Sequence, residues 1–316
     1  MTSSPEISVV IPLYNEVENI DDLCAQLKLG LAPLGRSYEV LLVDDGSRDG
    51  TGARALALAK SDPTLRVIRL RRNFGQTAAF SAGFDHARGR IVVTSDGDLQ
   101  NDPADIGAVV AALEEGDGCD IVCGWRKNRH DPLSKKIPSF FANRLISWAT
   151  GVQIHDYGCS LKALRADVVK GIRLYGEMHR FIPAVAAQMG VRVREVVVNH
   201  RPRTRGVSKY GIGRTTRVLL DLFTVKFFST YGTRPSHLFG FFGLIFGFVG
   251  FAILSYLTFI KFFEDQAIGA RPLLFFGGLS FLTGILLVNF GLMAELLMRT
   301  YYESQGKPNY VLKSDE

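Results

Sequence analysis

The segment T-S-D-G-D-L-Q, residues 94–100, places two carboxylates two positions apart, directly after an apolar run. If residues 91–93 form a strand, alternate side chains share a face, and Asp96 and Asp98 converge on one divalent cation. A metal held there can also bind a diphosphate. Asp-Gly-Asp is equally the sequence of an ordinary turn. An EF-hand loop is excluded, because the sixth position counted from Asp96 is not glycine.

Short apolar runs alternate with helical stretches over the first two hundred residues, which favours an α/β domain with a mostly parallel sheet. We expect strands at residues 8–11, 39–43, 66–70, 91–94, 121–123 and 192–197. We expect helices at residues 17–29, 51–60, 76–87 and 103–114. Ligands of such sheets bind beyond the carboxyl ends of the strands.

Four polar loops follow these strands, at residues 12–16, 44–51, 71–76 and 96–100. Together they offer carboxylates, amides, backbone donors and an arginine pair, which suits a nucleotide diphosphate with a metal. A dinucleotide is disfavoured, because no Gly-x-Gly-x-x-Gly follows the first strand.

Two stretches near the carboxyl terminus, residues 238–260 and 273–294, contain no charged residue. Each is long enough to cross roughly 30 Å of hydrocarbon as a helix. We predict a transmembrane hairpin of two helices, at about 238–260 and 273–297, within a segment 235–300. The alternative is a pair of buried core helices in a soluble protein.

Basic residues flank the outer ends of the hairpin, whereas the charges of its connecting loop balance. The positive-inside rule therefore puts both termini in the cytoplasm, and no signal peptide precedes the first strand. We expect a catalytic domain at residues 1–205, a basic juxtamembrane segment at 206–234 and a cytoplasmic tail at 301–316. The four cysteines form no Cys-x-x-Cys pair and are expected to be free thiols.

Four ordered motifs carry a family resemblance: S-V-V-I-P-L-Y-N-E at 8–16, V-D-D-G-S at 43–47, D-G-D-L-Q at 96–100 and D-Y-G-C-S-L-K at 156–162. The chain resembles a family 2 glycosyltransferase of GT-A fold, a Rossmann-like α/β domain. With its two C-terminal spans it is similar to the dolichol-phosphate mannose synthase group, and most of all to bacterial members that glucosylate undecaprenyl phosphate.

The resemblance implies a role for each matching residue. The nucleotide would be held by Pro12, Tyr14, Glu16, Asp44, Asp45, Arg72, Gln76 and Asp96. Asp98 and Gln100, with Asp96, would ligate Mg²⁺ or Mn²⁺. Asp156 would act beside the sugar with Asp96 and Asp98, as a catalytic base or as an orienting group. His155 and His179 are expected to lie outside the catalytic core.

The acceptor implied by the resemblance is a polyprenyl phosphate. Its second pKa is about 6 if it behaves like other phosphate monoesters, so it needs positioning by cations more than a strong base. Residues 201–217 are basic without an acidic residue. They supply Lys209 and Arg205 as predicted phosphate ligands, and Arg126 and Arg129 are further candidates. The same basic segment could instead meet anionic lipid headgroups.

The resemblance favours UDP-glucose as donor, inversion at the anomeric carbon, and a multi-pass protein of the bacterial inner membrane. GDP-mannose with a dolichol-type acceptor is the runner-up, and UDP-galactose or UDP-4-amino-4-deoxy-arabinose stays open. A non-catalytic scaffold that binds nucleotide sugar is the alternative of another class. The net charge of +6 suits an anionic membrane, and no nucleic-acid partner is expected.

Two further expectations concern packing. Phe141, Leu145 and Trp148 have the spacing of an interfacial helix, or of a core helix of the domain. Gly243 and Gly247 have the small-xxx-small spacing that lets helices pack closely. That pattern favours a homo-oligomer, or serves the two helices of the hairpin itself.

Overall fold

The computed structural model describes residues 4–115, 118–127, 143–148, 150–174, 176–202, 222, 224–227, 231 and 235–304. The chain divides into two compact units, Met1–Val225 and Lys226–Glu316, which are described separately. Three of the predicted phosphate ligands, Arg129, Arg205 and Lys209, lie outside the described residues, as does Phe141 of the expected interfacial helix.

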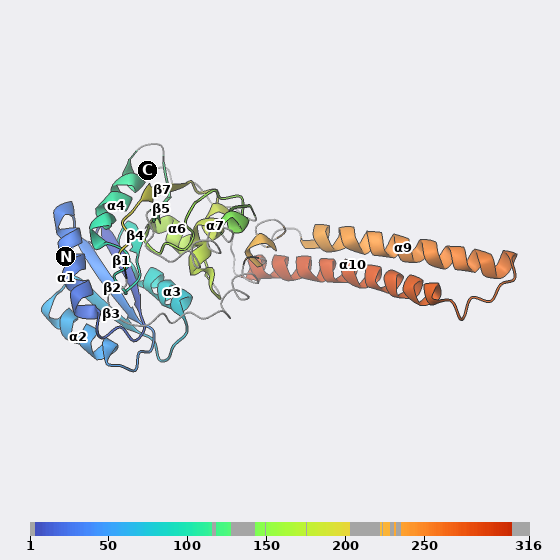
Figure 1. Cartoon of the computed structure of the whole chain (residues 1–316), viewed down its shortest axis with the longest axis horizontal. Helices are drawn as coiled ribbons and strands as arrows, with labels where there is room; N and C mark the ends of the chain where they lie inside the picture. Colours follow the sequence, from blue (N-terminus) through green and yellow to red (C-terminus); the bar gives the residue numbers. More distant parts are fainter. Residues whose placement is uncertain are drawn as a thin grey trace. The chain divides into compact units, whose positions relative to one another are not determined.

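The first unit is built on a seven-stranded sheet of order β3-β2-β1-β4-β6-β5-β7 (Figure 1). The strands are β1 Ile7–Leu13, β2 Tyr38–Asp44, β3 Leu65–Arg69, β4 Ile91–Thr94, β5 Ile121–Trp125, β6 Lys162–Arg165 and β7 Val193–Val197. All pairings are parallel except those of β6, which runs antiparallel to both β4 and β5. The mostly parallel α/β fold and all six predicted strands are confirmed.

Strand β6 is the one that the sequence analysis missed. It is only four residues long, begins with a lysine, and lies between β4 and β5 inside the sheet. A buried lysine breaks the apolar run by which a central strand is recognised. Its position depends on pairing with β4 and β5, which local sequence does not reveal.

Helices cover both faces of the sheet. They are α1 Ile20–Leu31, α2 Thr51–Ser61, α3 Gln76–His86, α4 Ile106–Glu114, α6 Ala166–Gly171 and α7 Ile182–Ala187, with 3₁₀ turns η1 Ala32–Leu34, η2 Pro103–Asp105 and η3 Met178–Phe181. Alternate residues of β1 point to opposite faces: Val9 packs with α1 and α4, and Val10 with Phe80 of α3. Each face of the sheet therefore has its own hydrophobic core, and the strands are packed between the two cores.

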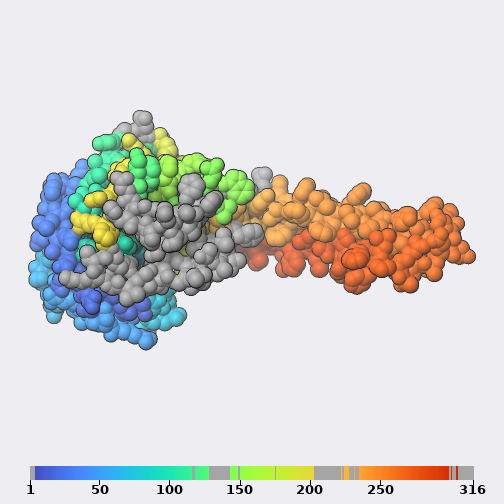
Figure 2. All heavy atoms as spheres, viewed as in Figure 1, coloured from blue at the N-terminus to red at the C-terminus, as the bar shows by residue number. Residues whose placement is uncertain are grey.

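The second unit contains two long apolar helices, α9 Pro235–Phe263 and α10 Pro272–Ser304. Both are long and apolar enough to cross a membrane, α10 over Pro272–Met298. They pack side by side along their length (Figure 2). The two expected C-terminal apolar helices are therefore present as a hairpin.

Glycines form the seam between α9 and α10. A Cβ on Gly250 would lie 2.3 Å from the backbone nitrogen of Phe281, and one on Gly284 would lie 2.4 Å from that of Gly247. A Cβ on Gly243 would lie 2.9 Å from the carbonyl oxygen of Gly284. The small-xxx-small pattern thus serves the hairpin's own packing, which is the second of its two expected uses.

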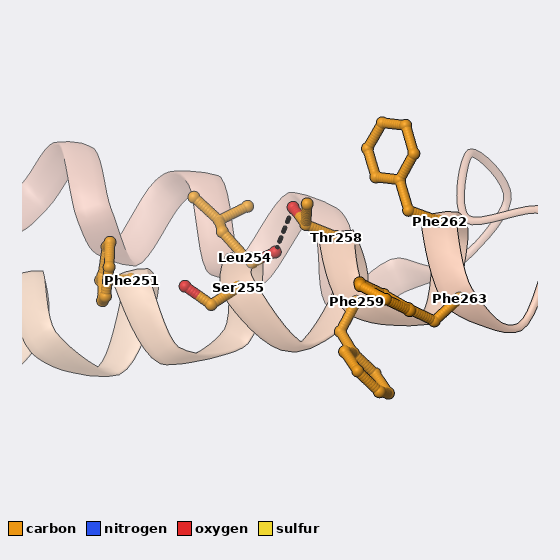
Figure 3. A pocket seen from close by; sticks show the side chains of 7 residues that line it. All are labelled: Phe251, Leu254, Ser255, Thr258, Phe259, Phe262 and Phe263. Carbon is orange, nitrogen blue, oxygen red and sulfur yellow. Dashed lines mark hydrogen bonds between the residues drawn. The ribbon is translucent and has the colours of Figure 1, made fainter.

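A shallow hollow on α9 is lined by Phe251, Leu254, Ser255, Thr258, Phe259, Phe262 and Phe263 (Figure 3). The hydroxyl of Thr258 donates to the carbonyl of Leu254 at 2.8 Å, so it is satisfied within the helix. The rings of Phe259 and Phe263 stack with centroids 4.7 Å apart. This surface suits hydrocarbon chains better than a polar ligand.

Candidate active site

The four polar loops predicted from the sequence meet at the carboxyl edge of the sheet. Strands β1, β2, β3 and β4 are parallel neighbours, so their carboxyl ends lie along one edge. The loops after β1, β2, β3 and β4 are residues 14–19, 45–50, 70–75 and 95–102. These loops, with the adjoining Pro12, Asp44 and Gln76, hold the predicted nucleotide and metal ligands.

The loop after β1 is fixed to the loop after β2. The backbone N–H of Asn15 donates to Oγ of Ser47 at 2.9 Å, and Oδ1 of Asn15 accepts from the backbone N–H of Arg48 at 2.9 Å. The backbone N–H of Glu16 donates to Oγ1 of Thr51 at 2.8 Å. Pro12, Tyr14 and Glu16 are half-buried beside these contacts. The two loops therefore form one rigid wall of the site.

Asp44 is the last residue of strand β2, Asp45 follows it, and both are buried. Asp44 accepts from the backbone N–H of Ser47 at 2.9 Å and lies 3.7 Å from Nε of Arg69. A Cβ on Gly52 would lie 2.1 Å from Oδ2 of Asp44, so only glycine lets α2 begin this close to the carboxylate.

Asp45 binds the backbone of the loop after β3 through hydrogen bonds. Its two oxygens accept from the backbone N–H groups of Phe74, at 2.7 Å, and Gly75, at 2.9 Å. Burial raises its pKa, against the lowering effect of these two hydrogen bonds. Asp45 thus holds the loop that carries Arg72 and leads into Gln76, the first residue of α3. The guanidinium of Arg72 is exposed and lies 4.4 Å from the ring centroid of Phe74.

The loop after β4 is bound to α3 and to the core. Nε2 of Gln76 donates to Oδ1 of Asp96 at 2.6 Å, and Oδ1 of Asp98 accepts from the backbone N–H of Gln100 at 3.2 Å. Leu99 has a positive φ of 60°, which is strained for a residue with a branched side chain, and its side chain is buried in the core. This anchor turns the loop so that its carboxylates lie at the sheet edge.

Asp96, Asp98 and Gln100 suit a divalent cation that also binds the phosphates of a substrate. Among the described residues, no group of three or more His, Cys, Asp and Glu side chains could enclose a metal. Two carboxylates and one amide oxygen, from Asp96, Asp98 and Gln100, suit a hard cation that takes its other ligands from phosphate and water. Burial raises the pKa of Asp96, and the charge of Asp98 adds to the rise. A bound cation would offset that repulsion.

Asp156 and Arg126 meet next to this loop. Nε of Arg126 donates to Oδ2 of Asp156 at 2.7 Å, and Nη2 donates to Oδ1 at 3.0 Å. The side chain of Asp156 is only 3% exposed, and that of Arg126 is 11% exposed. Burial alone would lower the pKa of Arg126, but the hydrogen bonds and charge of Asp156 outweigh it and raise the pKa. The predicted base and one predicted phosphate ligand are thus engaged with each other.

Lys162 is a charged residue at the site to which the sequence analysis gave no role. It opens β6 opposite Thr94 and Cys123, it is 2% exposed, and its ammonium donates to the carbonyl of Cys159. Its positive charge lowers the pKa of Asp96, against the effect of burial. A lysine directly before the apolar residues Ala163 and Leu164 was the available signal.

Other candidates have structural partners. Nδ1 of His179 lies 2.8 Å from Oγ1 of Thr77, and the buried ring packs beside Phe80. Arg201 forms an ion pair with Asp102 at 2.6 Å. Four free cysteines are present, of which Cys119, Cys123 and Cys159 are buried.

Comparison with known proteins gives one family match. The family model for glycosyl transferase family 2 matches residues 8–173. A dodecaprenyl-phosphate galacturonate synthase of Rhizobium johnstonii is 47% identical, over 98% of this chain and 93% of the relative. An undecaprenyl-phosphate 4-deoxy-4-formamido-L-arabinose transferase of Klebsiella pneumoniae is 35% identical, again over 98% and 93%.

Solved structures share the fold at low sequence identity. A glucosyl-3-phosphoglycerate synthase of Mycobacterium tuberculosis, in complex with Mn²⁺, UDP and phosphoglyceric acid, has a TM-score of 0.56 and 18% identity, over 71% of this chain and 78% of the other. A mannosyltransferase of Pyrobaculum calidifontis, in complex with GDP-Man and Mn²⁺, has a TM-score of 0.50 and 19% identity, over 98% and 83%.

Proposed function

Since this chain belongs to glycosyltransferase family 2 and is a glycosyltransferase, we propose that it transfers a sugar from a nucleotide donor to the phosphate of a polyprenyl phosphate. One observation carries this proposal: the 47% identity extends over 98% of the chain, hairpin included, to a relative named for a polyprenyl-phosphate product. An apolar hairpin on the same chain as a diphosphate site suits a lipid that bears a phosphate.

In this proposal the loops after β1, β2 and β3 bind the nucleotide, and the loop after β4 faces its diphosphate. Asp44 and residues 12–16 hold base and ribose, with Arg72 and Gln76 beside the phosphates. Asp98 and Gln100, with Asp96, would hold Mg²⁺ or Mn²⁺, and a cation there would supply stabilisation of negative charge on the departing nucleoside diphosphate.

The acceptor phosphate attacks the anomeric carbon from the side opposite the diphosphate, so an α-linked donor gives a β-linked product. The phosphate is largely deprotonated near neutral pH, since its second pKa is about 6. Asp156 therefore acts as an orienting carboxylate that holds Arg126 toward the reacting groups. Lys209, Arg205 and Arg129 supply further cationic contacts to the acceptor.

The donor is a separate proposal. The family resemblance favours UDP-glucose, whereas the reported relatives are named for galacturonate and for a formamido-arabinose. We place UDP-galacturonate first, because the relative named for galacturonate is 47% identical. UDP-glucose, a UDP-linked 4-formamido-arabinose and GDP-mannose remain the donors to compare.

We place the hairpin in the inner membrane of a bacterium, with the catalytic domain on the cytoplasmic side. Both helices have suitable length and hydropathy, and large apolar side chains such as Phe248, Phe262 and Phe275 are exposed on them. Lipid would cover these side chains.

The test is transfer of radiolabelled sugar to undecaprenyl phosphate by the full chain in detergent, with each donor in turn and with Mg²⁺ or Mn²⁺. Labelled lipid from one donor, lost with EDTA, is the expected result. Nucleotide binding without labelled lipid from any donor would contradict the proposal and favour a scaffold. The product's anomeric configuration, read by NMR, tests inversion independently.

A further inference from the structure

Glu195, on β7, accepts three hydrogen bonds from the segment that carries Asp156. Its Oε1 accepts from the backbone N–H of His155 at 2.7 Å and from that of Asp156 at 3.2 Å. Its Oε2 pairs with Nδ1 of His155 at 2.8 Å. The Glu195 side chain is only 11% exposed, whereas the His155 side chain is 66% exposed, so the carboxylate is the buried partner in these contacts.

The same segment is held from a second side by β5. The rings of Trp125 and His155 stack with centroids 4.3 Å apart and an interplanar angle of 16°. Arg126 follows Trp125 and donates to both oxygens of Asp156. Strands β5 and β7 pair in parallel, with Cys123 opposite Glu195. Trp125 and Glu195 therefore belong to neighbouring strands of the same sheet.

Residues 155–156 lie outside every helix and strand. Their backbone N–H groups have no place in a sheet ladder, and the Glu195 side chain supplies the acceptor instead. A carboxylate that must act on a sugar or on Arg126 needs a fixed backbone, since a misplacement of about 1 Å can cost about 100-fold in rate.

We propose that Glu195 is a positioning residue, which sets the place of Asp156 by accepting the backbone N–H groups of residues 155 and 156. The proposal rests on the proposed transferase function, in which Asp156 takes part. The residue acts through its hydrogen bonds and through Asp156, without contact with substrate.

Two substitutions separate hydrogen bonding from charge. Glu195→Ala removes the acceptor, and kcat is expected to fall about 100-fold with little change in the donor KM, because the nucleotide loops belong to other strands. Glu195→Gln keeps an amide oxygen for both backbone N–H groups and is expected to retain most of kcat. Glu115→Ala, at an exposed glutamate, is the control.

A second readout does not depend on activity. Hydrogen exchange of the peptide that contains residues 155 and 156 is expected to be slow in the wild type and in Glu195→Gln, and fast in Glu195→Ala. Equal kcat loss in the Gln and Ala variants, or unchanged exchange in the Ala variant, overturns the inference. A wild type that transfers no sugar refutes the proposed function, whereas an active wild type with a fully active Ala variant refutes only the role of Glu195.

Discussion

Arg126 donates two side-chain hydrogen bonds to Asp156, at 2.7 and 3.0 Å, so the cation expected to bind acceptor phosphate is paired with the carboxylate expected to act beside the sugar. A guanidinium and a carboxylate match in a bidentate geometry and stabilise each other's charge. The pair is almost completely buried. Removing either partner takes the bidentate ion pair away from the other.

Asp156→Asn is expected to lower both activity and stability. The amide keeps the shape of the side chain but removes the charge with which Arg126 is paired, and the loss of one partner of a buried ion pair typically costs about 3–5 kcal/mol. Denaturant unfolding of the detergent-solubilised protein measures the loss. Asp85→Asn is the matched control, since Asp85 is 66% exposed and lies 3.9 Å from Arg173. Equal stability of the two variants would contradict the role given to the buried pair.

Asp98→Asn is expected to raise the metal concentration that gives half-maximal activity by on the order of tenfold or more, because an amide oxygen carries no charge for a hard cation. Titration of Mn²⁺ into the EDTA-treated enzyme measures this. Affinity for UDP without metal should stay close to that of the wild type. An unchanged metal requirement would remove Asp98 from the predicted ligand set.

Gly250→Ala is expected to destabilise the hairpin by about 1–3 kcal/mol, because the new methyl group would overlap the backbone of Phe281. Gly240→Ala is the matched control on the same helix, since a Cβ there meets no atom within 4 Å. Thermal unfolding of the helical signal in detergent compares the two. If both variants melt like the wild type, the glycine seam does not hold the helices together.

Glu39→Gln tests a pH dependence of the sheet core. Burial would raise the pKa of Glu39, but hydrogen bonds from Ser8, Arg66 and the backbone of Arg88 outweigh it and lower the pKa. A carboxylate with a lowered folded-state pKa stabilises the fold above its unfolded pKa of about 4.3, and that contribution is lost as the pH falls through the folded value.

The free energy of unfolding should therefore differ most between wild type and Glu39→Gln near neutral pH. The difference should shrink below about pH 4, as the wild-type carboxyl becomes protonated. Chemical denaturation at several pH values measures it. A difference that stays constant down to pH 3 would show that the ionised carboxylate is not what stabilises the core.

The amino-acid sequence by itself determined the elements that repeat a local pattern. Short apolar runs predicted six of the seven strands, the stretches between them predicted α1 to α4, and the length of two stretches without charge predicted the apolar hairpin. Because neighbouring parallel strands end at one edge, the same pattern also predicted that the loops with Asp44, Gln76, Asp96 and Asp98 would meet.

Only the tertiary structure decided which charged groups face one another. Strand β6 with Lys162, the pairing of Arg126 with Asp156, and the contacts of Glu195 with residues 155 and 156 join positions far apart in the chain. Such contacts leave no periodic signal, because a buried charge selects its partner by distance in the folded protein, where water no longer screens it.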